Sequence, residues 1–232
     1  MLYSPRELAQ RIDHTLLKPD APEAAVRQLC GEARTHGFIS VCILPCWVSV
    51  AQAELEDSGV RVGTVVGFPL GANATAVKGF EAEEAMRDGA DELDMVLNIS
   101  AVKSAAWQAV EADIAAVVAI AEAGGAEVKA ILECAYLTEA EKRHAAEIVA
   151  GSGAAFVKTS TGFGPGGATV DDVRLLREVA HGRCGVKAAG GIRDLKTALA
   201  MLDAGATRLG TSAGLAILQE AASLSTPPSE RP

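Results

Sequence analysis

The chain has 232 residues, of which 49 % are hydrophobic, 22 % are charged and only 4 % are aromatic. This length and this apolar content fit one large α/β domain and exclude an extensively disordered chain. The formal net charge of −9 excludes the basic excess of a nucleic-acid-binding protein. A small anionic substrate remains open, because it needs only a locally positive pocket.

The five cysteines are odd in number and fall partly in apolar runs, so we expect reduced thiols, as in a cytoplasmic protein. Cys42 and Cys46 have no second pair of metal ligands nearby, so no metal site is expected. The first residues lack the apolar core of a signal peptide, and no stretch reaches the roughly 18 apolar residues of a membrane span.

Short β-type runs alternate along the chain with Ala/Glu-rich segments of helical spacing. The runs predict strands at 12–16, 38–44, 60–68, 92–97, 128–134, 154–159, 185–189 and 208–211. Eight strand–helix units of about 25 to 35 residues predict a single (β/α)8 TIM barrel, here preceded by a short N-terminal helix. We expect this barrel to span residues 1–222 and the polar, Pro-rich segment 223–232 to be disordered.

Three helix starts carry local signals, the weakest at Thr169 and Asp172. Thr138 and Glu141 have the spacing of a capping box, in which each side chain bonds the backbone N–H of the other residue. Asn73 is a candidate N-cap for the helix that follows it. These signals place the helices after the third, fifth and sixth predicted strands.

Lys158 ends an apolar strand and is followed by a Thr/Ser/Gly loop. The active site of a TIM barrel lies at this end of the strands. Burial there disfavours the ammonium form, lowering the lysine pKa from about 10.4, and a neutral amine can attack a carbonyl to form a Schiff base. The alternative interpretation is a lysine whose amine simply extends to water.

Lys187 repeats this pattern one strand–helix unit later, so both lysines are predicted to point into the same mouth. Repulsion between two ammonium groups favours the loss of a proton from Lys158. Asp94 lies inside an apolar strand and could exchange protons with both lysines through water, or form a structural salt bridge. We interpret Lys129 and Glu133, in the next strand, as an interior ion pair that packs and orients.

Glycine-rich loops follow the last three predicted strands, at 162–164, 190–191 and 210–213. Backbone N–H groups in such turns and at helix N-termini bind anions, which predicts a phosphate site. At the first strand, Asp13 or Thr15 could bind a substrate hydroxyl, whereas His14 is interpreted as a structural histidine. Cys42 near the mouth either packs or is a thiol that reacts with aldehydes.

With these residues assembled, the chain resembles the deoxyribose-phosphate aldolase family. The matching segments are IDHTLL, SVCILP, VVGFPLG, GADELDMVLN, VKTSTGFG, VKAAGGIR and RLGTS, in that order over nearly the whole chain. The resemblance implies a class I aldolase that reversibly cleaves 2-deoxy-D-ribose 5-phosphate to D-glyceraldehyde 3-phosphate and acetaldehyde. It implies a lysine Schiff base, with no cofactor and no metal. The charge and the lack of a long apolar stretch predict no nucleic-acid or membrane partner. The cysteines predict a cytoplasmic protein, and general precedent for soluble enzymes predicts a homodimer.

The resemblance also implies residue roles. Lys158 is similar to the Schiff-base lysine, Lys187 to the lysine that perturbs it, and Asp94 to the acid/base aspartate. The positions that match a phosphate and sugar pocket are Gly162, Gly190, Gly191, Ser212, Thr161, Asp13 and Thr15.

The chain departs from the family pattern at Ala213, where some relatives have a second serine. It also has no tyrosine in the segment 223–232, whereas some relatives close the site with a C-terminal tyrosine. Two alternatives stay open at this point. One is a related Schiff-base aldolase or transaldolase with another donor, and the other is a catalytically impaired barrel that binds a sugar phosphate.

Overall fold

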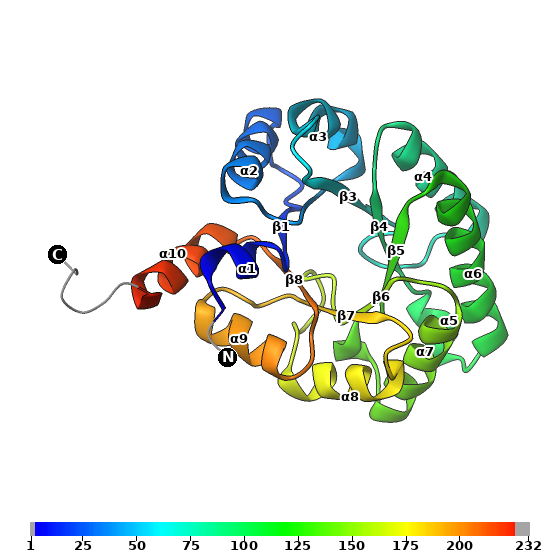
Figure 1. Cartoon of the computed structure of the whole chain (residues 1–232). Helices are drawn as coiled ribbons and strands as arrows, with labels where there is room; N and C mark the ends of the chain where they lie inside the picture. Colours follow the sequence, from blue (N-terminus) through cyan, green and yellow to red (C-terminus); the bar gives the residue numbers. More distant parts are fainter. Residues whose placement is uncertain (1–2, 226–232) are drawn as a thin grey trace.

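The computed structural model describes residues 3–225, and within them eight parallel strands form a closed barrel (Figure 1). The strands are β1 (Ile12–Leu16), β2 (Ser40–Ile43), β3 (Arg61–Val66), β4 (Glu92–Val96), β5 (Glu127–Ile131), β6 (Phe156–Lys158), β7 (Gly185–Ala189) and β8 (Arg208–Thr211). Each strand pairs with the next along the chain, and β1 pairs with β8 to close the barrel. The predicted (β/α)8 barrel is therefore confirmed.

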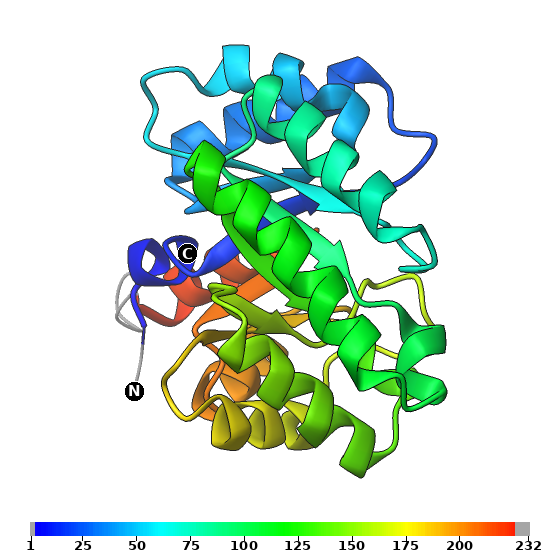
Figure 2. The ribbon, with the colours of Figure 1, turned by 90° about the vertical axis from the view of Figure 1, so that its right-hand side faces the viewer.

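Helices form a ring around the strands, as Figure 1 shows along the barrel axis and Figure 2 from the side. They are α1 (Pro5–Ala9), α2 (Glu23–His36), α3 (Val48–Leu55), α4 (Thr75–Arg87), α5 (Ile99–Lys103), α6 (Trp107–Gly124), α7 (Glu139–Gly151), α8 (Val170–Ala180), α9 (Leu195–Asp203) and α10 (Gly214–Ser225), with 3-10 turns η1 (Pro45–Trp47) and η2 (Cys134–Tyr136). The predicted short N-terminal helix is α1, which packs against α10. In residues 3–225 we find no helix of the length and apolarity needed to cross a membrane.

The local helix signals give a mixed result. Thr138 and Glu141 form the predicted capping box at the start of α7. The prediction for Asn73 is wrong: α4 begins after Ala74, which has no side-chain cap. The Asn73 amide instead donates a hydrogen bond of 3.0 Å to Oε1 of Glu81, so it joins the loop to the helix rather than capping it.

The strands place apolar side chains outward against the helices and charged side chains inward. In β4, Leu93 and Met95 belong to the hydrophobic core, whereas Glu92 and Asp94 reach Lys129 by ion pairs inside the barrel. This follows from the two-residue alternation of a β-strand. Barrel interiors are commonly filled by bulky aliphatic residues. Here an ionic network occupies part of that space.

Helix α10 continues to Ser225, so the first three residues of the segment 223–232 are helical rather than disordered as we expected. Nothing in these three residues breaks a helix, and the first proline follows at Pro227. A helix commonly ends before the residue that precedes a proline. Residues 226–232 lie outside the described part of the chain.

Candidate active site

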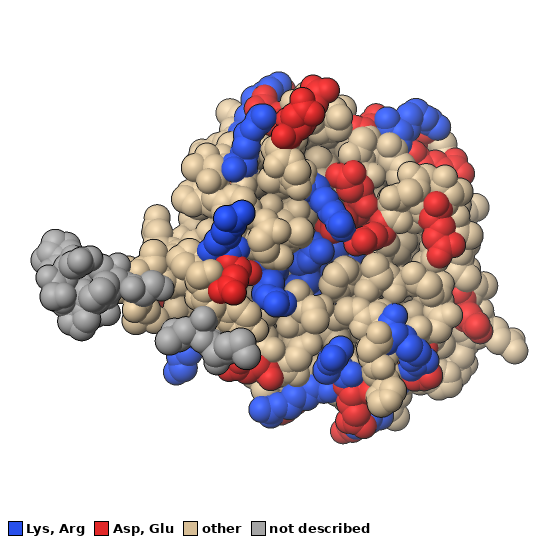
Figure 3. Space-filling view, viewed as in Figure 1, with Lys and Arg blue, Asp and Glu red and all other residues tan. Residues whose placement is uncertain are grey.

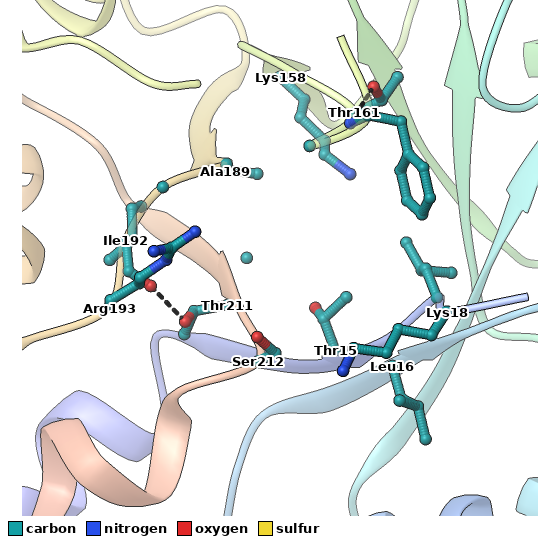
Figure 4. A pocket seen from close by; sticks show the side chains of 16 residues that line it. Thr15, Leu16, Lys18, Lys158, Thr161, Ala189, Ile192, Arg193, Thr211 and Ser212 are labelled. Atoms are coloured by element: carbon teal, nitrogen blue, oxygen red, sulfur yellow. Dashed lines mark hydrogen bonds between the residues drawn. The ribbon is translucent and has the colours of Figure 1, made fainter. Parts of the chain in front are cut away.

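A pocket of about 340 Å³ opens at the C-terminal ends of the strands. It is lined by residues at or after the ends of β1, β6, β7 and β8. Figure 4 shows the amino group of Lys158 pointing into this pocket, with Thr15 and Ser212 across from it. The volume lies in the range of pockets that hold small molecules.

Lys158 is the last residue of β6 and lies at the inner end of the pocket, where its side chain is only 3 % exposed. Its amine is 2.7 Å from Oδ2 of Asp94. Burial lowers the pKa of Lys158, and the positive charge of Lys187 lowers it further, while Asp94 opposes the shift. A lowered pKa increases the fraction of neutral, nucleophilic amine near neutral pH.

Lys187 lies directly beside Lys158 in the register of β6 and β7, as the sequence predicted. Its amine is 2.6 Å from the same Asp94 oxygen and 2.5 Å from Oδ2 of Asp13. Burial acts to lower the pKa of Lys187, but the carboxylates of Asp13 and Asp94 raise it above its ordinary value. Lys187 therefore keeps its proton under conditions in which Lys158 loses its own.

Asp94 joins three lysines in the centre of the barrel. Its Oδ2 accepts hydrogen bonds from Lys158 and Lys187, and its Oδ1 is 3.0 Å from the amine of Lys129. Burial would raise the pKa of Asp94, but the three ammonium groups hold it well below the usual range. The carboxylate is thus ionised and within hydrogen-bond reach of Lys158, which lines the pocket, and of Lys187, which is buried beside it and does not line the pocket.

The predicted ion pair between Lys129 and Glu133 is wrong. Lys129 pairs instead with Glu92, at 2.5 Å, and with Asp94. Strand β5 ends at Ile131, and Glu133 has a φ of 54°, so the alternation that would point its side chain toward Lys129 is already lost. The Glu133 carboxylate accepts hydrogen bonds from the backbone N–H and the hydroxyl of Thr161.

Thr161 connects Glu133 to the loop after β6 by hydrogen bonds. Its hydroxyl oxygen accepts a hydrogen bond of 3.0 Å from the backbone N–H of Phe163, so Glu133 and Thr161 together shape the turn at Gly162. Gly162 has a φ of 87°, which side chains other than hydrogen rarely allow. Thr161 and Gly162 both line the pocket, as predicted.

The other glycine loops reach the same pocket. Gly190 and Gly191, after β7, have φ angles of 87° and 80° and line it together with Ser212. The hydroxyl of Thr211 donates to the carbonyl of Ile192 at 2.6 Å and accepts from the N–H of Ala213 at 2.9 Å. This threonine ties the loop after β7 to the loop after β8, so the segments predicted to bind phosphate lie side by side.

The residues of β1 separate into different roles. Thr15 lines the pocket. The expectation that Asp13 also faces the sugar is not supported: it is fully buried and pairs with Lys187 and, at 2.7 Å, with Arg208. Asp13 and Thr15 share a strand face, but Asp13 lies two residues deeper in the barrel.

The interpretation of His14 as a structural residue agrees with its surroundings. It points outward, where Nε2 is 2.8 Å from Glu32 and the ring stacks on Phe38 with centroids 4.6 Å apart. Cys42 is buried in a small apolar cluster with Leu17 and Val65. Burial raises the pKa of the Cys42 thiol to about 11, so the thiol stays protonated at neutral pH.

Sequence reasoning missed four charged residues. Lys18 and Arg193 line the pocket. Lys18 directly follows the matched segment IDHTLL and Arg193 ends the matched segment VKAAGGIR, so their positions in the sequence could have indicated them. Glu92 lies two residues before Asp94 on the same face of β4, and Arg208 starts β8 facing inward. Among residues 3–225, no group of three or more His, Cys, Asp or Glu side chains is arranged to hold a metal ion.

A (β/α)8 barrel with a buried lysine of lowered pKa, a paired carboxylate and glycine loops around one pocket has the parts of a Schiff-base-forming barrel enzyme. The model of the DeoC/LacD family of aldolases matches residues 8–220, and the chain belongs to this family.

Relatives and solved structures agree with this assignment. The deoxyribose-phosphate aldolase of Lactococcus lactis subsp. lactis is 54 % identical over 92 % of this chain and 96 % of its own. The deoxyribose-phosphate aldolase of Thermococcus gammatolerans is 53 % identical over 93 % of this chain and 96 % of its own. The structure of the aldolase QR15 is similar with a TM-score of 0.88 and 43 % identity over 92 % of this chain and 95 % of its own. The structure of the tetrameric deoxyribose phosphate aldolase of Aeropyrum pernix is similar with a TM-score of 0.89. It is 37 % identical in sequence and covers 95 % of this chain and 93 % of its own.

Proposed function

We propose that this protein is a class I aldolase that reversibly cleaves 2-deoxy-D-ribose 5-phosphate to D-glyceraldehyde 3-phosphate and acetaldehyde. The observation that carries the proposal is Lys158, a buried lysine of lowered pKa that opens into the pocket beside Asp94 and Lys187. Family membership and the relatives named as deoxyribose-phosphate aldolases support the same reaction.

In this mechanism, neutral Lys158 attacks the C1 aldehyde of the open-chain sugar. The carbinolamine loses water to give a protonated imine, which accepts the electron pair of the C2–C3 bond as the C3 hydroxyl loses its proton. The resulting enamine is protonated at C2 and hydrolysed to acetaldehyde. Asp94 and Lys187, with a bridging water, are the groups we assign to the proton transfers, because both lie within hydrogen-bond reach of Lys158 or its partner oxygen.

The phosphate of the substrate is assigned to the glycine-loop side of the pocket. We assign the backbone or hydroxyl donors for the phosphate to Gly162, Gly190, Gly191 and Ser212, which line the pocket there, and Thr161 holds the first of these loops in shape. Lys18 and Arg193 add positive charge to a pocket of a protein whose overall charge is negative. Thr15 faces the same pocket and is assigned to a sugar hydroxyl.

The test is reductive trapping. The protein is incubated with acetaldehyde or deoxyribose 5-phosphate and borohydride, digested, and the adduct is located by mass spectrometry. We expect one reduced adduct on Lys158 and none in Lys158→Met. A folded sample with adducts only on exposed lysines such as Lys196 would overturn the proposal. It would favour a barrel that binds a sugar phosphate without turnover, which thermal stabilisation by the substrate would then support.

Donor choice separates this reaction from that of a related aldolase. With D-glyceraldehyde 3-phosphate as acceptor, product is expected with acetaldehyde and not with dihydroxyacetone. The reverse preference would assign the protein to another Schiff-base aldolase.

We further propose that the enzyme is a cytoplasmic homodimer. Helix α4 and the loop before it expose Leu70, Val77 and Phe80, whose side chains are between 47 % and 69 % exposed, and a second copy of the chain would cover them. Sedimentation equilibrium is expected to give twice the mass of the 23.8 kDa chain. A monomer at micromolar concentration would contradict this.

A further inference from the structure

The ionic network around Asp94 continues below the pocket, toward the N-terminal ends of the strands. Four further charged side chains belong to it, and each is at most 8 % exposed. They are Asp13, Glu92, Lys129 and Arg208. Nothing in the proposed chemistry requires them to touch the substrate, so their presence in the barrel interior needs another reason.

One chain of contacts leads from Glu92 to the pocket. Glu92 is 2.5 Å from the amine of Lys129, which is 3.0 Å from Oδ1 of Asp94. The other oxygen of Asp94 is 2.7 Å from the amine of Lys158. Glu92 is therefore connected to Lys158 through two charged residues, Lys129 and Asp94.

A second chain of contacts leads from Arg208. Its guanidinium is 2.7 Å from Asp13, and Asp13 is 2.5 Å from the amine of Lys187. Lys187 is 2.6 Å from the Asp94 oxygen that also accepts from Lys158. Arg208 and Glu92 are themselves 3.1 Å apart, so the two chains meet again at the far end of the network.

The charges of this network cancel when Lys158 is neutral. It holds three acids and, besides Lys158, three bases. The acids are Asp13, Glu92 and Asp94, and the bases are Lys129, Lys187 and Arg208. Protonation of Lys158 would leave one uncompensated positive charge on a side chain that is only 3 % exposed, where an unpaired charge is costly.

The direction of each pKa shift agrees with this balance. Although burial opposes ionisation in every case, the pKa values of the three acids are lowered by the neighbouring cations, and those of the three bases are raised by the neighbouring carboxylates. Among the four basic groups of this network, only Lys158 has a lowered pKa, with burial as the largest cause.

We propose that Glu92 and Arg208 are positioning residues that set the protonation state of Lys158 from the opposite end of the barrel interior, by fixing the net charge of the network. The proposal rests on the proposed function of Lys158 as the Schiff-base lysine. It assigns to the first residues of β4 and β8 a role in reactivity, although both lie below the pocket.

Other titratable groups near the pocket leave this balance unchanged. Cys42 on β2 has its pKa raised to about 11 by burial and stays neutral near pH 7. Glu133 is held by Thr161 on the loop after β6. Lys18 and Arg193 belong to the open side of the pocket and are exposed to solvent screening.

The far end of the network reaches the surface at the face shown in Figure 3, where basic and acidic side chains lie next to one another around the centre. Arg61 and Glu127, the first residues of β3 and β5, are 42 % and 43 % exposed and pair with each other at 2.9 Å. Arg61 also approaches Glu92 at 3.2 Å. A substitution of Arg61 therefore changes the charge next to Glu92 without altering a side chain inside the barrel.

The test measures the rate of acetaldehyde trapping on Lys158 by cyanoborohydride as a function of pH. Acetaldehyde has no ionisable group, so a difference between variants in the midpoint of the acid limb reports a group of the enzyme. Glu92→Gln removes a negative charge and is expected to lower the midpoint. Arg208→Gln removes a positive charge and is expected to raise it. With an effective dielectric constant of about 20, a charge that acts through two intervening residues is expected to shift the midpoint by on the order of one pH unit.

The double variant, in which Glu92→Gln and Arg208→Gln are combined, restores neutrality and is expected to return the midpoint close to that of the unmodified protein. A purely structural role would instead make the double variant at least as impaired as the singles. Should a single variant fail to fold, Arg61→Ala tests the same charge at a half-exposed position. It is expected to raise the midpoint slightly at low salt.

Midpoints that move in the same direction in the two folded single variants, or that stay where they are, would overturn the proposal. So would an unchanged midpoint in Arg61→Ala, if that is the variant available. Failure of the proposed function is distinguishable, because then the unmodified protein would give no adduct on Lys158 at any pH.

Discussion

Gly190 is the position at which the phosphate side of the pocket can be perturbed most selectively. Its φ of 87° favours glycine, and a Cβ there would lie 3.0 Å from Cα of Gly167 and 3.5 Å from Cα of Gly162. The N–H of Ala168 donates to the carbonyls of Ala189 and Gly190, so the loops after β6 and β7 pack backbone to backbone. Gly190→Ala must therefore push these two loops apart.

The magnitude has two parts. A left-handed conformation costs an alanine roughly 1–2 kcal/mol, which lowers the free energy of unfolding. Displacing one backbone donor from a charged phosphate loses roughly 1.5–3 kcal/mol of binding, since hydrogen bonds to charged groups are worth this much. At about 1.4 kcal/mol for each factor of ten, KM for deoxyribose 5-phosphate should rise roughly 10- to 100-fold.

Gly182→Ala is the matched control. Its φ is 82°, but a Cβ there would have no atom within 4 Å, and it lies between α8 and β7 away from the pocket. Both variants should lose stability in urea unfolding through the left-handed backbone, and Gly190→Ala should lose more because its Cβ also meets the backbone of Gly167. Only Gly190→Ala should weaken cleavage of deoxyribose 5-phosphate, while cleavage of unphosphorylated deoxyribose changes little. Equal losses with both substrates, or an unchanged KM, would refute the placement of the phosphate at these loops.

Three further outcomes are expected. Because burial lowers the pKa of Lys158, its charged form is favoured in the unfolded chain and the residue lowers stability below a pH of about 10.4. Lys158→Met should therefore unfold at a higher urea concentration than the unmodified protein at pH 7. The difference in urea concentration should shrink as the pH approaches about 10.4. A lower stability of Lys158→Met at pH 7 would contradict this. Glu133→Gln weakens the anchor of Thr161 and should raise KM for deoxyribose 5-phosphate several-fold with little change in kcat, whereas a loss confined to kcat would argue against an anchoring role. Iodoacetamide should label the exposed Cys46 well before the buried Cys42, and the order of labelling by mass spectrometry checks this.

The sequence allowed the barrel and the central lysines to be predicted because both depend on local or regularly repeated features. Alternation of side chains along a strand fixes which residues face inward, and the repeat of strand–helix units places Lys158 and Lys187 at equal depth on neighbouring strands. The glycine loops follow the same logic, since each comes directly after its strand. The physical determinants of these features lie within about one unit of the chain.

Local patterns also misled where the chain leaves regular structure. Glu133 follows Lys129 by four residues, which in a continued strand would place both on one face. The strand ends after Ile131 and the backbone at Glu133 turns into the left-handed region, so the carboxylate binds Thr161 instead.

Only the closure of the barrel decided how the interior charges pair. Arg208 and Asp13 are 195 residues apart and meet because β8 pairs with β1. The sequence places Asp13 at the first strand, but its depth relative to Thr15 and to Lys187 depends on the stagger of all eight strands. The candidate nucleophile could therefore be predicted from its own strand, whereas the charge balance that we propose sets its protonation state arises from six other side chains on five strands and exists only in the folded barrel.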